Sequence, residues 1–325
     1  MKAKLTGTLM AIVALAGCGG GSGGGSSSTS STAPVVETPP VIVTPAPVVT
    51  VPALVTAAPA SSYAARHLET FETVNRHRLA CGFGALTQNT RLDAASNAHA
   101  AYIQANGRVV THDQVRGQPG FTGATPGDRT AAAGYVGTTS EGVYVQSEAV
   151  VLSGSAMPIL LLSGPYHAID MLAGWRDVGL ATSSNDLVIS YVIASGVPLR
   201  TASGVRTYPC EGLSGVPFAG GNEIPSPFPT RPADFNWGAP VIVVGSGALR
   251  VSTAAITGPS GSVSLAAVYA DGQTADPNGR CKGSVACVIP NILAQNTKYA
   301  VVVTGTHDGV PFERNFSFTT SGVLK

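Results

Sequence analysis

The chain has 325 residues and carries 19 Lys and Arg against 18 Asp and Glu, so its formal net charge is +1 at pH 7. This balance gives no long-range attraction to nucleic acid, and no apolar run beyond the N-terminus approaches the ~20 residues of a membrane span. Hydrophobic residues make up 44% of the chain, enough for a core. The length suggests roughly two domains with additional segments. A polytopic membrane protein, a coiled coil and a nucleic-acid-binding protein are therefore disfavoured.

Residues 1–17 are typical of an export signal, because two Lys residues precede a short apolar stretch and then small residues. The segment runs into Leu15-Ala16-Gly17-Cys18, which resembles the lipobox of bacterial lipoproteins. That resemblance implies cleavage before Cys18 and lipidation of Cys18, and so a membrane anchor. Gly19 gives no inner-membrane retention signal by the same resemblance, which favours the outer membrane or cell surface. The alternative is an ordinary signal peptide followed by an incidental Cys.

Residues 18–61 read as a linker. Its first part is almost entirely Gly, Ser and Thr, and its second part is Pro, Val, Thr and Ala. The first composition is typical of a flexible coil and the second of a stiffer, extended chain. Neither can bury a core. A tether of this kind reaches up to about 100 Å from the lipid.

Five Cys residues are present. Assigning Cys18 to the lipid leaves four, an even number in an exported protein, where disulfides persist. Four Cys allow three connectivities. The pairing Cys81–Cys210 and Cys281–Cys287 keeps each bond inside one predicted domain, and we expect it. The absence of a C-x-x-C motif gives no support to a zinc ribbon or a thioredoxin-like site.

Residues 62–224 are predicted to form the first domain. A helical pattern begins at Tyr63 and ends at Gly82 and Gly84, and Asn89 or Thr90 caps a second helix. A loop is expected from Asn106 to Gly137. Further along the chain we expect a helix that includes Ile159–Leu162, and strands at Gly142–Val145 and Leu187–Ala194.

An ordered set of short motifs in this domain resembles the CAP superfamily (cysteine-rich secretory, antigen 5 and pathogenesis-related 1) in its short bacterial form. The matching residues, in chain order, are Phe71-x-x-x-Asn75-x-x-Arg78, Leu86, Leu92, His112, Asp128-Arg129, Gly134-Tyr135, Glu141, Ser163-Gly164-Pro165-Tyr166-His167, Met171-Leu172 and Val178-Gly179-Leu180. The resemblance covers roughly 120 to 130 residues and implies a three-layer α-β-α sandwich.

The same resemblance implies a cleft with two His and two acidic residues, matched here by His112, Glu141 and His167. The second acidic residue has no clear counterpart, and Glu148 is the nearest candidate. The Asn that usually follows the first Glu is Gly142 here. Two imidazoles and a carboxylate can bind Zn²⁺ or another divalent metal, or exchange a proton. A purely structural hydrogen-bonded cluster is the alternative.

Other titratable residues have simpler interpretations. His99 lies on the apolar stripe of the second helix and is expected to be a hydrogen-bonded core residue. His67 and His77 are expected to be solvated. Asp170 and Asp177 are interpreted as surface or capping residues.

Three Ser residues lie near the cleft residues in the sequence: Ser140, Ser147 and Ser163. No motif singles one of them out as a nucleophile, and a sequence cannot show a Ser–His contact. A hydrolase therefore stays an alternative that has no motif of its own, and whether the chain is an enzyme stays open.

Residues 225–325 begin with a Pro-rich segment and continue with strand-like patterns, which predicts a small β-sandwich. Asp271-Gly272 and Asp308-Gly309 indicate hairpin turns, and Trp237 is interpreted as a core residue. Its last segment resembles immunoglobulin-like or fibronectin-like modules of bacterial surface proteins. The expected strands are Val241–Val244, Leu249–Thr257, Ser262–Tyr269, Tyr299–Thr304 and Phe312–Thr319.

The sequence thus predicts an α+β chain: a lipid-anchored CAP-like α-β-α sandwich followed by a small all-β sandwich. The first hypothesis is binding of a small apolar ligand, a lipid or sterol, or of a divalent metal at His112, Glu141 and His167. The second is a metal- or His-assisted hydrolase in the same cleft. The third is a surface spacer or adhesion protein whose cleft is vestigial.

Overall fold

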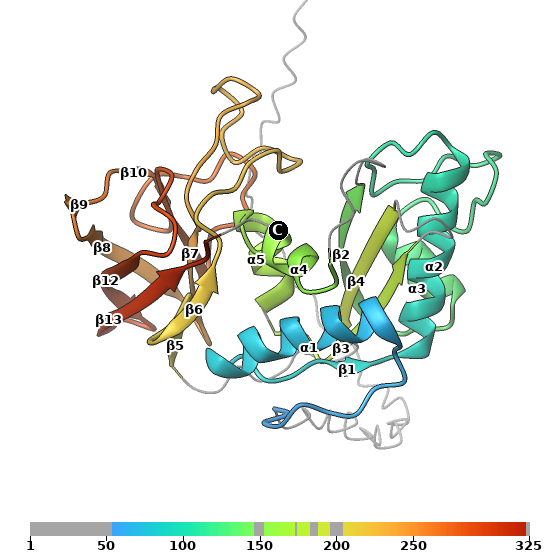
Figure 1. The fold of residues 1–325 in the computed structure, drawn as a ribbon, viewed down its shortest axis with the longest axis horizontal. Coiled ribbons are helices and arrows are strands. Elements are labelled where there is room, and N and C mark those ends of the chain that lie inside the picture. Colours follow the sequence, from blue (N-terminus) through green and yellow to red (C-terminus); the bar gives the residue numbers. More distant parts are fainter. Residues whose placement is uncertain (1–53, 146–152, 173, 183–187, 196–203, 323–325) are drawn as a thin grey trace, which may run out of the picture. The chain divides into compact units, whose positions relative to one another are not determined.

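The computed structural model describes residues 54–145, 153–172, 174–182, 188–195 and 204–322. Residues 49–325 form one compact unit (Figure 1). The predicted signal peptide, Cys18 and the linker up to residue 53 lie outside the described residues, as do Glu148 and Ser147.

The N-terminal part of this unit is a mixed sheet between two layers of helices. The sheet has the order β1-β3-β4-β2, with β1 parallel to β3 and the other pairs antiparallel. Helices α2 and α3 lie on one face, and α4 and α5 lie on the other (Figure 1). The elements are α1 (Ala65–Ala80), β1 (Thr87–Gln88), α2 (Thr90–Ala105), α3 (Pro126–Ala132), β2 (Thr138–Val145), α4 (Ala156–Leu161), α5 (Pro165–Leu172), β3 (Asp177–Thr182) and β4 (Val188–Ser195).

Local chemistry explains where α1 and α2 begin and end. The Asn89 side chain accepts from the Arg91 amide and caps α2, as its sequence predicts. Gly82 follows α1 with a φ of 74°, a conformation that glycine adopts at little cost. At Gly179, a Cβ would lie 2.4 Å from the Leu92 Cβ. The bare glycine therefore lets α2 pack closely on β3.

Helix α3 corrects one expectation, because it lies inside the predicted loop from Asn106 to Gly137. Thr125 caps it by accepting from the Asp128 amide at 3.2 Å, and Asp128 accepts in return from the Thr125 amide at 3.0 Å. Pro126 stands in the first turn, where its missing amide costs no hydrogen bond. The capping-box pattern Thr-x-x-Asp was the sequence signal for this helix.

The C-terminal part contains two sheets that share one hydrophobic core with α1, α4 and α5. Their strand orders are β10-β11-β7-β5 and β6-β13-β12-β8-β9. The strands are β5 (Val205–Tyr208), β6 (Leu213–Val216), β7 (Val241–Gly245), β8 (Leu249–Gly258), β9 (Gly261–Ser262), β10 (Leu265–Tyr269), β11 (Val285–Pro290), β12 (Lys298–His307) and β13 (Val310–Thr320). Strands appear at all five predicted places, the third of them divided between β9 and β10. Strands β5, β6 and β11 were not predicted.

Both predicted Asp-Gly pairs lie between consecutive antiparallel strands, but only one of them forms a tight turn. His307 pairs with Val310, so Asp308-Gly309 forms a two-residue turn between β12 and β13, and both turn residues have positive φ. Asp271-Gly272 lies in the connection between β10 and β11, which are adjacent and antiparallel as a hairpin requires. This connection is long, however, so Asp271-Gly272 is not a two-residue turn between the two strands.

Both disulfides join the predicted Cys pairs. The Cys81–Cys210 bond connects the end of α1 to the turn between β5 and β6. Strand β5 pairs with β7 and β6 pairs with β13, so this turn belongs with the C-terminal sheets although it precedes the expected boundary at residues 224/225. The bond therefore fixes α1 to these sheets. The division into domains stays a prediction.

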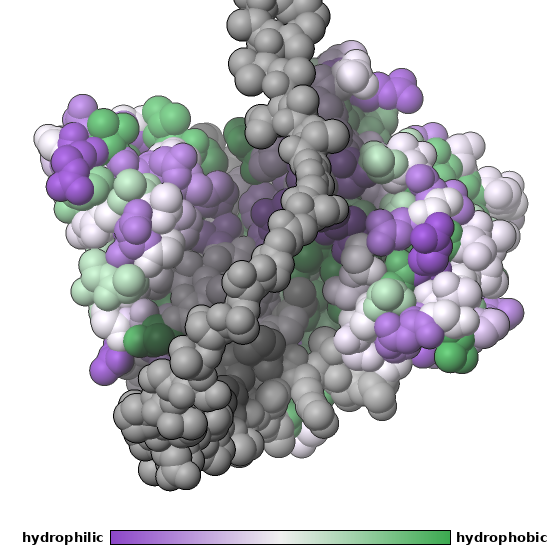
Figure 2. Space-filling view, turned by 180° about the vertical axis from the view of Figure 1, so that it is seen from behind, coloured by the Kyte–Doolittle hydropathy of each residue, from purple (hydrophilic) through white to green (hydrophobic). Residues whose placement is uncertain are grey.

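The described residues include no helix that is both long and apolar enough to span a bilayer. On the face shown in Figure 2, hydrophobic residues are interspersed with hydrophilic ones over the coloured surface. Singly exposed hydrophobic residues of this kind are normal for a folded protein.

Candidate functional site

Glu141 lies on the edge strand β2, and its side chain is 1% exposed. The Arg129 guanidinium, also 1% exposed, donates from Nη2 to both Glu141 oxygens at 2.8 Å. A buried carboxylate without a cation would carry a large desolvation cost. Arg129 on α3 therefore compensates the charge of Glu141 inside the domain.

Two imidazoles approach the same carboxylate. His112 Nδ1 lies 3.1 Å from Glu141 Oε2, and His99 Nε2 lies 3.4 Å from it. His99 Nε2 also lies 2.9 Å from the Thr111 carbonyl oxygen, which can only accept. Nε2 therefore carries the His99 proton, and Nδ1 accepts from the Gln114 amide at 3.1 Å. The expectation that His99 is a hydrogen-bonded core residue is confirmed, and burial lowers the pKa of His99 despite the nearby Glu141.

His167 lies on α5, on the opposite face of the sheet from Arg129, and its partner is Glu223. Glu223 Oε1 accepts from the His167 backbone amide at 2.8 Å and lies 2.7 Å from His167 Nδ1. Burial lowers the pKa of His167, but the hydrogen bond and charge of Glu223, with the charge of Asp170, outweigh it, so the net pKa is raised.

Glu223 was not among the predicted site residues. Its side chain is 2% exposed, and Oε2 has no hydrogen-bond partner within the described part of the chain. A Cβ at Gly164 would lie 2.6 Å from Glu223 Oε1, so a glycine is needed at this position for the carboxylate to reach α5. No local signal marked Glu223, because it follows His167 by 56 positions and stands outside every recognised motif.

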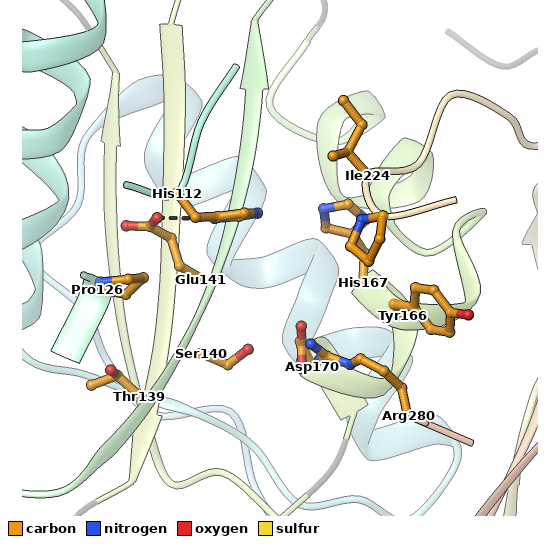
Figure 3. Close-up of a pocket in the computed structure, with 11 residues that line it drawn as sticks. His112, Pro126, Thr139, Ser140, Glu141, Tyr166, His167, Asp170, Ile224 and Arg280 are labelled. Carbon is orange, nitrogen blue, oxygen red and sulfur yellow. Dashed lines mark hydrogen bonds and ion pairs between the residues drawn. The ribbon is translucent and has the colours of Figure 1, made fainter. Parts of the chain in front are cut away.

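The three predicted cleft residues line one cavity of about 220 Å³, here called the His cavity. Each His uses Nδ1 for a carboxylate, so each has Nε2 left for the cavity. Figure 3 shows the two rings extending toward each other from opposite sides, His112 beside β2 and His167 from α5. The three residues that the sequence pattern indicated therefore lie around one cavity. Glu148 cannot be placed, because it is outside the described residues.

The floor of the His cavity holds an ion pair between Asp170 on α5 and Arg280 of the C-terminal part (Figure 3). Tyr166 lies beneath the Arg280 guanidinium, with 5.9 Å between the guanidinium carbon and the ring centre. Burial raises the pKa of Asp170. Arg280 lies outside the segment that carries the predicted cleft, and its contribution was not expected.

Three expectations about polar residues are wrong. Asp170 lines the His cavity, and Asp177 is 5% exposed and accepts from the Tyr135 hydroxyl at 2.8 Å. His77 is 4% exposed and packs on Tyr208. The partners of these side chains come from distant parts of the sequence: Arg280 for Asp170, Tyr135 for Asp177 and Tyr208 for His77.

The arrangement does not fit a resident metal ion. Among the described residues, no three His, Cys, Asp or Glu side chains are grouped so that they could hold one. Both Glu141 oxygens already accept from Arg129, whose positive charge would oppose a cation bound there. His112, Glu141 and His167 therefore share a cavity without forming a coordination sphere.

The arrangement also lacks the geometry of a Ser–His nucleophile pair. Ser140 lines the cavity but forms no hydrogen bond with a His among the described residues, and nearby Ser163 donates to the Leu160 carbonyl at 2.6 Å. The Ser–His contact of the described C-terminal residues, Ser246 with His307, uses His307 Nε2, which also accepts from a backbone amide. That nitrogen has no free lone pair with which to activate a hydroxyl.

This part of the chain has a mixed sheet between helical layers. Two carboxylate-bound imidazoles face one cavity beside it. Residues 71–185 match the model of the cysteine-rich secretory protein family, CAP. This segment is therefore similar to CAP domains. It contains His112, Glu141 and His167, whereas Glu223 and Arg280 lie beyond the matched residues. No curated protein matches the chain.

Proposed function

We propose that the chain is an exported, lipid-anchored CAP-domain protein that binds a small polar ligand between His112 and His167. The observation that carries this proposal is that both imidazoles are held at Nδ1 by buried carboxylates and present Nε2 to one cavity. Partners that fix the ring and its tautomer in this way prepare an imidazole for binding.

The size and lining of the His cavity support a polar ligand over a lipid or sterol. Its volume of about 220 Å³ corresponds to roughly seven water molecules at ~30 Å³ each, and drug-sized ligands occupy about 300–1,000 Å³. Charged or polar side chains provide much of the lining, including Asp170, Arg280 and Ser140. A ligand here gains more from hydrogen bonds than from burying apolar surface.

Export and anchoring rest on Cys18, its lipobox and the linker up to residue 61. Two disulfides fit an oxidising compartment outside the cytosol. On this proposal the lipid holds the chain at the outer membrane or cell surface, and the C-terminal sheets form an immunoglobulin-like module. A purely structural module would not need Arg280 in the lining of the His cavity.

The test uses the chain from residue 18 with Cys18→Ser, labelled at its His rings for NMR. Acetate, glycine and glycerol are added separately as an anionic, a zwitterionic and a neutral polar probe. We expect at least one probe to shift the Nε2 resonances of both His112 and His167, while His67, outside the cavity, serves as the control. Unchanged His112 and His167 resonances with all three probes would contradict the proposal.

The same sample tests the hypothesis that His112, Glu141 and His167 bind a divalent metal. Zn²⁺ alone should not bind stoichiometrically, because Arg129 occupies the Glu141 oxygens. Stoichiometric Zn²⁺ that is lost in the His112→Ala/His167→Ala variant would replace the small-ligand proposal with a metal site.

A further inference from the structure

A second cavity, of about 400 Å³, is formed mainly by residues 222–237, outside the CAP match. Its volume falls in the range of small-molecule sites, and such sites combine aromatic walls with a few polar groups. Phe228, Phe235 and Trp237 line it together with Arg231. We call it the aromatic cavity.

The aromatic wall is held in place from behind. Phe228 packs edge-on against Phe235, with 5.0 Å between ring centres, and against Trp237 at 5.6 Å. Trp237 is 2% exposed, and its Nε1 donates to the Ser163 carbonyl at 2.9 Å, which fixes the indole. Its interpretation as a core residue is confirmed. The Tyr269 ring supports Phe228 at 6.1 Å. A ligand therefore meets a wall whose rings are already ordered, which lowers the entropic cost of binding.

Arg231 provides a positive charge at this cavity. Its side chain is exposed, and its guanidinium carbon lies 5.3 Å from the centre of the Phe235 ring. A guanidinium stays charged at any physiological pH. None of the ion pairs formed by the described residues includes Arg231. The ring thus positions a cation whose donors are available to a ligand.

The carboxylate of Glu223 faces a different direction. Glu223 also lines the aromatic cavity, but its carboxylate lies against Gly164 and accepts from His167 on α5. It is almost fully buried there. The exposed charge of the cavity is therefore that of Arg231.

We propose that the aromatic cavity binds a monocarboxylate with an apolar body, the body against Phe228 and Phe235 and the carboxylate on Arg231. A guanidinium fork matches a carboxylate, and the aromatic rings match an apolar body. This proposal does not rest on the small-ligand proposal, because Ile224 is the one lining residue that the two cavities share, and neither Arg231 nor the aromatic rings line the His cavity. Free fatty acids and aromatic acids share this chemistry.

The experiment compares 3-phenylpropanoate with 3-phenylpropanol, its neutral analogue, by calorimetry on the chain from residue 18 with Cys18→Ser. We expect the carboxylate to bind more tightly than the alcohol, and Arg231→Gln to reduce its affinity by about fivefold while leaving the alcohol unchanged. Phe235→Ala should weaken both probes.

The matched control is Arg116→Gln. Arg116 has the same geometry over Phe121, also at 5.3 Å, but it does not line the aromatic cavity. The affinity of that variant for both probes should equal that of the parent chain. Equal affinity of the two probes, equal losses in the two Arg variants, or no binding of the carboxylate would overturn the proposal. The affinity of decanoate compared with that of 3-phenylpropanoate then separates fatty-acid from aromatic-acid preference.

Discussion

His77 is expected to make the stability of this protein depend on pH. It lies in the last turn of α1, is 4% exposed, and has Nδ1 3.0 Å from the Tyr208 hydroxyl. Burial, helped by the charge of Arg76, lowers the pKa of His77 from 6.5 to about 4. The folded protein therefore holds His77 neutral at a pH where the unfolded chain protonates it.

The sign and size follow from proton linkage. Because the folded pKa is lowered, the contribution of His77 is fully present above pH 6.5 and is lost as the pH falls toward 4. A difference of about 2.5 pKa units at 1.36 kcal/mol each corresponds to roughly 3 kcal/mol. Below the folded pKa both states are protonated, and the loss stops.

Urea denaturation between about pH 7 and pH 4 measures this contribution when His77→Gln is compared with the parent chain. Gln preserves a hydrogen-bonding group for Tyr208 but does not titrate. The free energy of unfolding of the variant should fall by roughly 3 kcal/mol less than that of the parent over this range. His67→Gln, on the same helix but only partly buried, is the control. A difference between parent and His77→Gln that does not change with pH would refute the reasoning.

Three further predictions concern the links between the N-terminal part, which includes the CAP match, and the C-terminal sheets. Replacing Cys81 and Cys210 by Ala should cost about 5 kcal/mol in urea denaturation, because the bond joins residues 129 positions apart. Glu223→Gln should lower the pKa of His167 in an NMR titration, because it removes the charge that raises it. Trp237→Phe should cost about 1–3 kcal/mol of unfolding free energy, because it leaves a buried carbonyl without its donor.

Each of these three predictions has a control variant or an outcome that would contradict it. Removing the Cys281–Cys287 bond, which spans 6 positions, should cost about 2 kcal/mol, and losses as large as for the long-range bond would contradict the loop argument. Trp175→Phe removes a buried Nε1 that has no partner in the described structure, so it should cost less than Trp237→Phe. An unchanged His167 titration in Glu223→Gln would show that Glu223 does not set that pKa.

The elements with strong periodicity or a capping signal were the predictable part of the fold. The α1 and α2 patterns, the Asn89 cap and the Asp308-Gly309 turn all depend on neighbours within a few positions. On β13, Phe316 and Phe318 are buried while Glu313 and Asn315 are exposed, which is the alternation of a strand with one buried face. Local rules suffice for such elements because the interactions that form them are local.

Contacts between distant segments could not be predicted in this way. His77 was expected to be solvated because α1 alone does not cover it, yet Tyr208 covers it from 131 positions away. Asp170 meets Arg280 across 110 positions. In both cases the burial of a polar side chain depends on the packing of the C-terminal sheets. The sequence of the helix alone does not contain this information.

The two imidazoles of the His cavity are consequently oriented by carboxylates from different parts of the chain. Glu141 orients His112, and its own charge is compensated by Arg129 within the CAP match. His167 is oriented by Glu223, which the CAP match does not include. A CAP domain with the same His residues but another C-terminal part would lose the partner of His167 and the cation on the cavity floor. The lining and charge of this cavity are therefore set jointly by both parts of the chain, so the CAP match by itself does not define them.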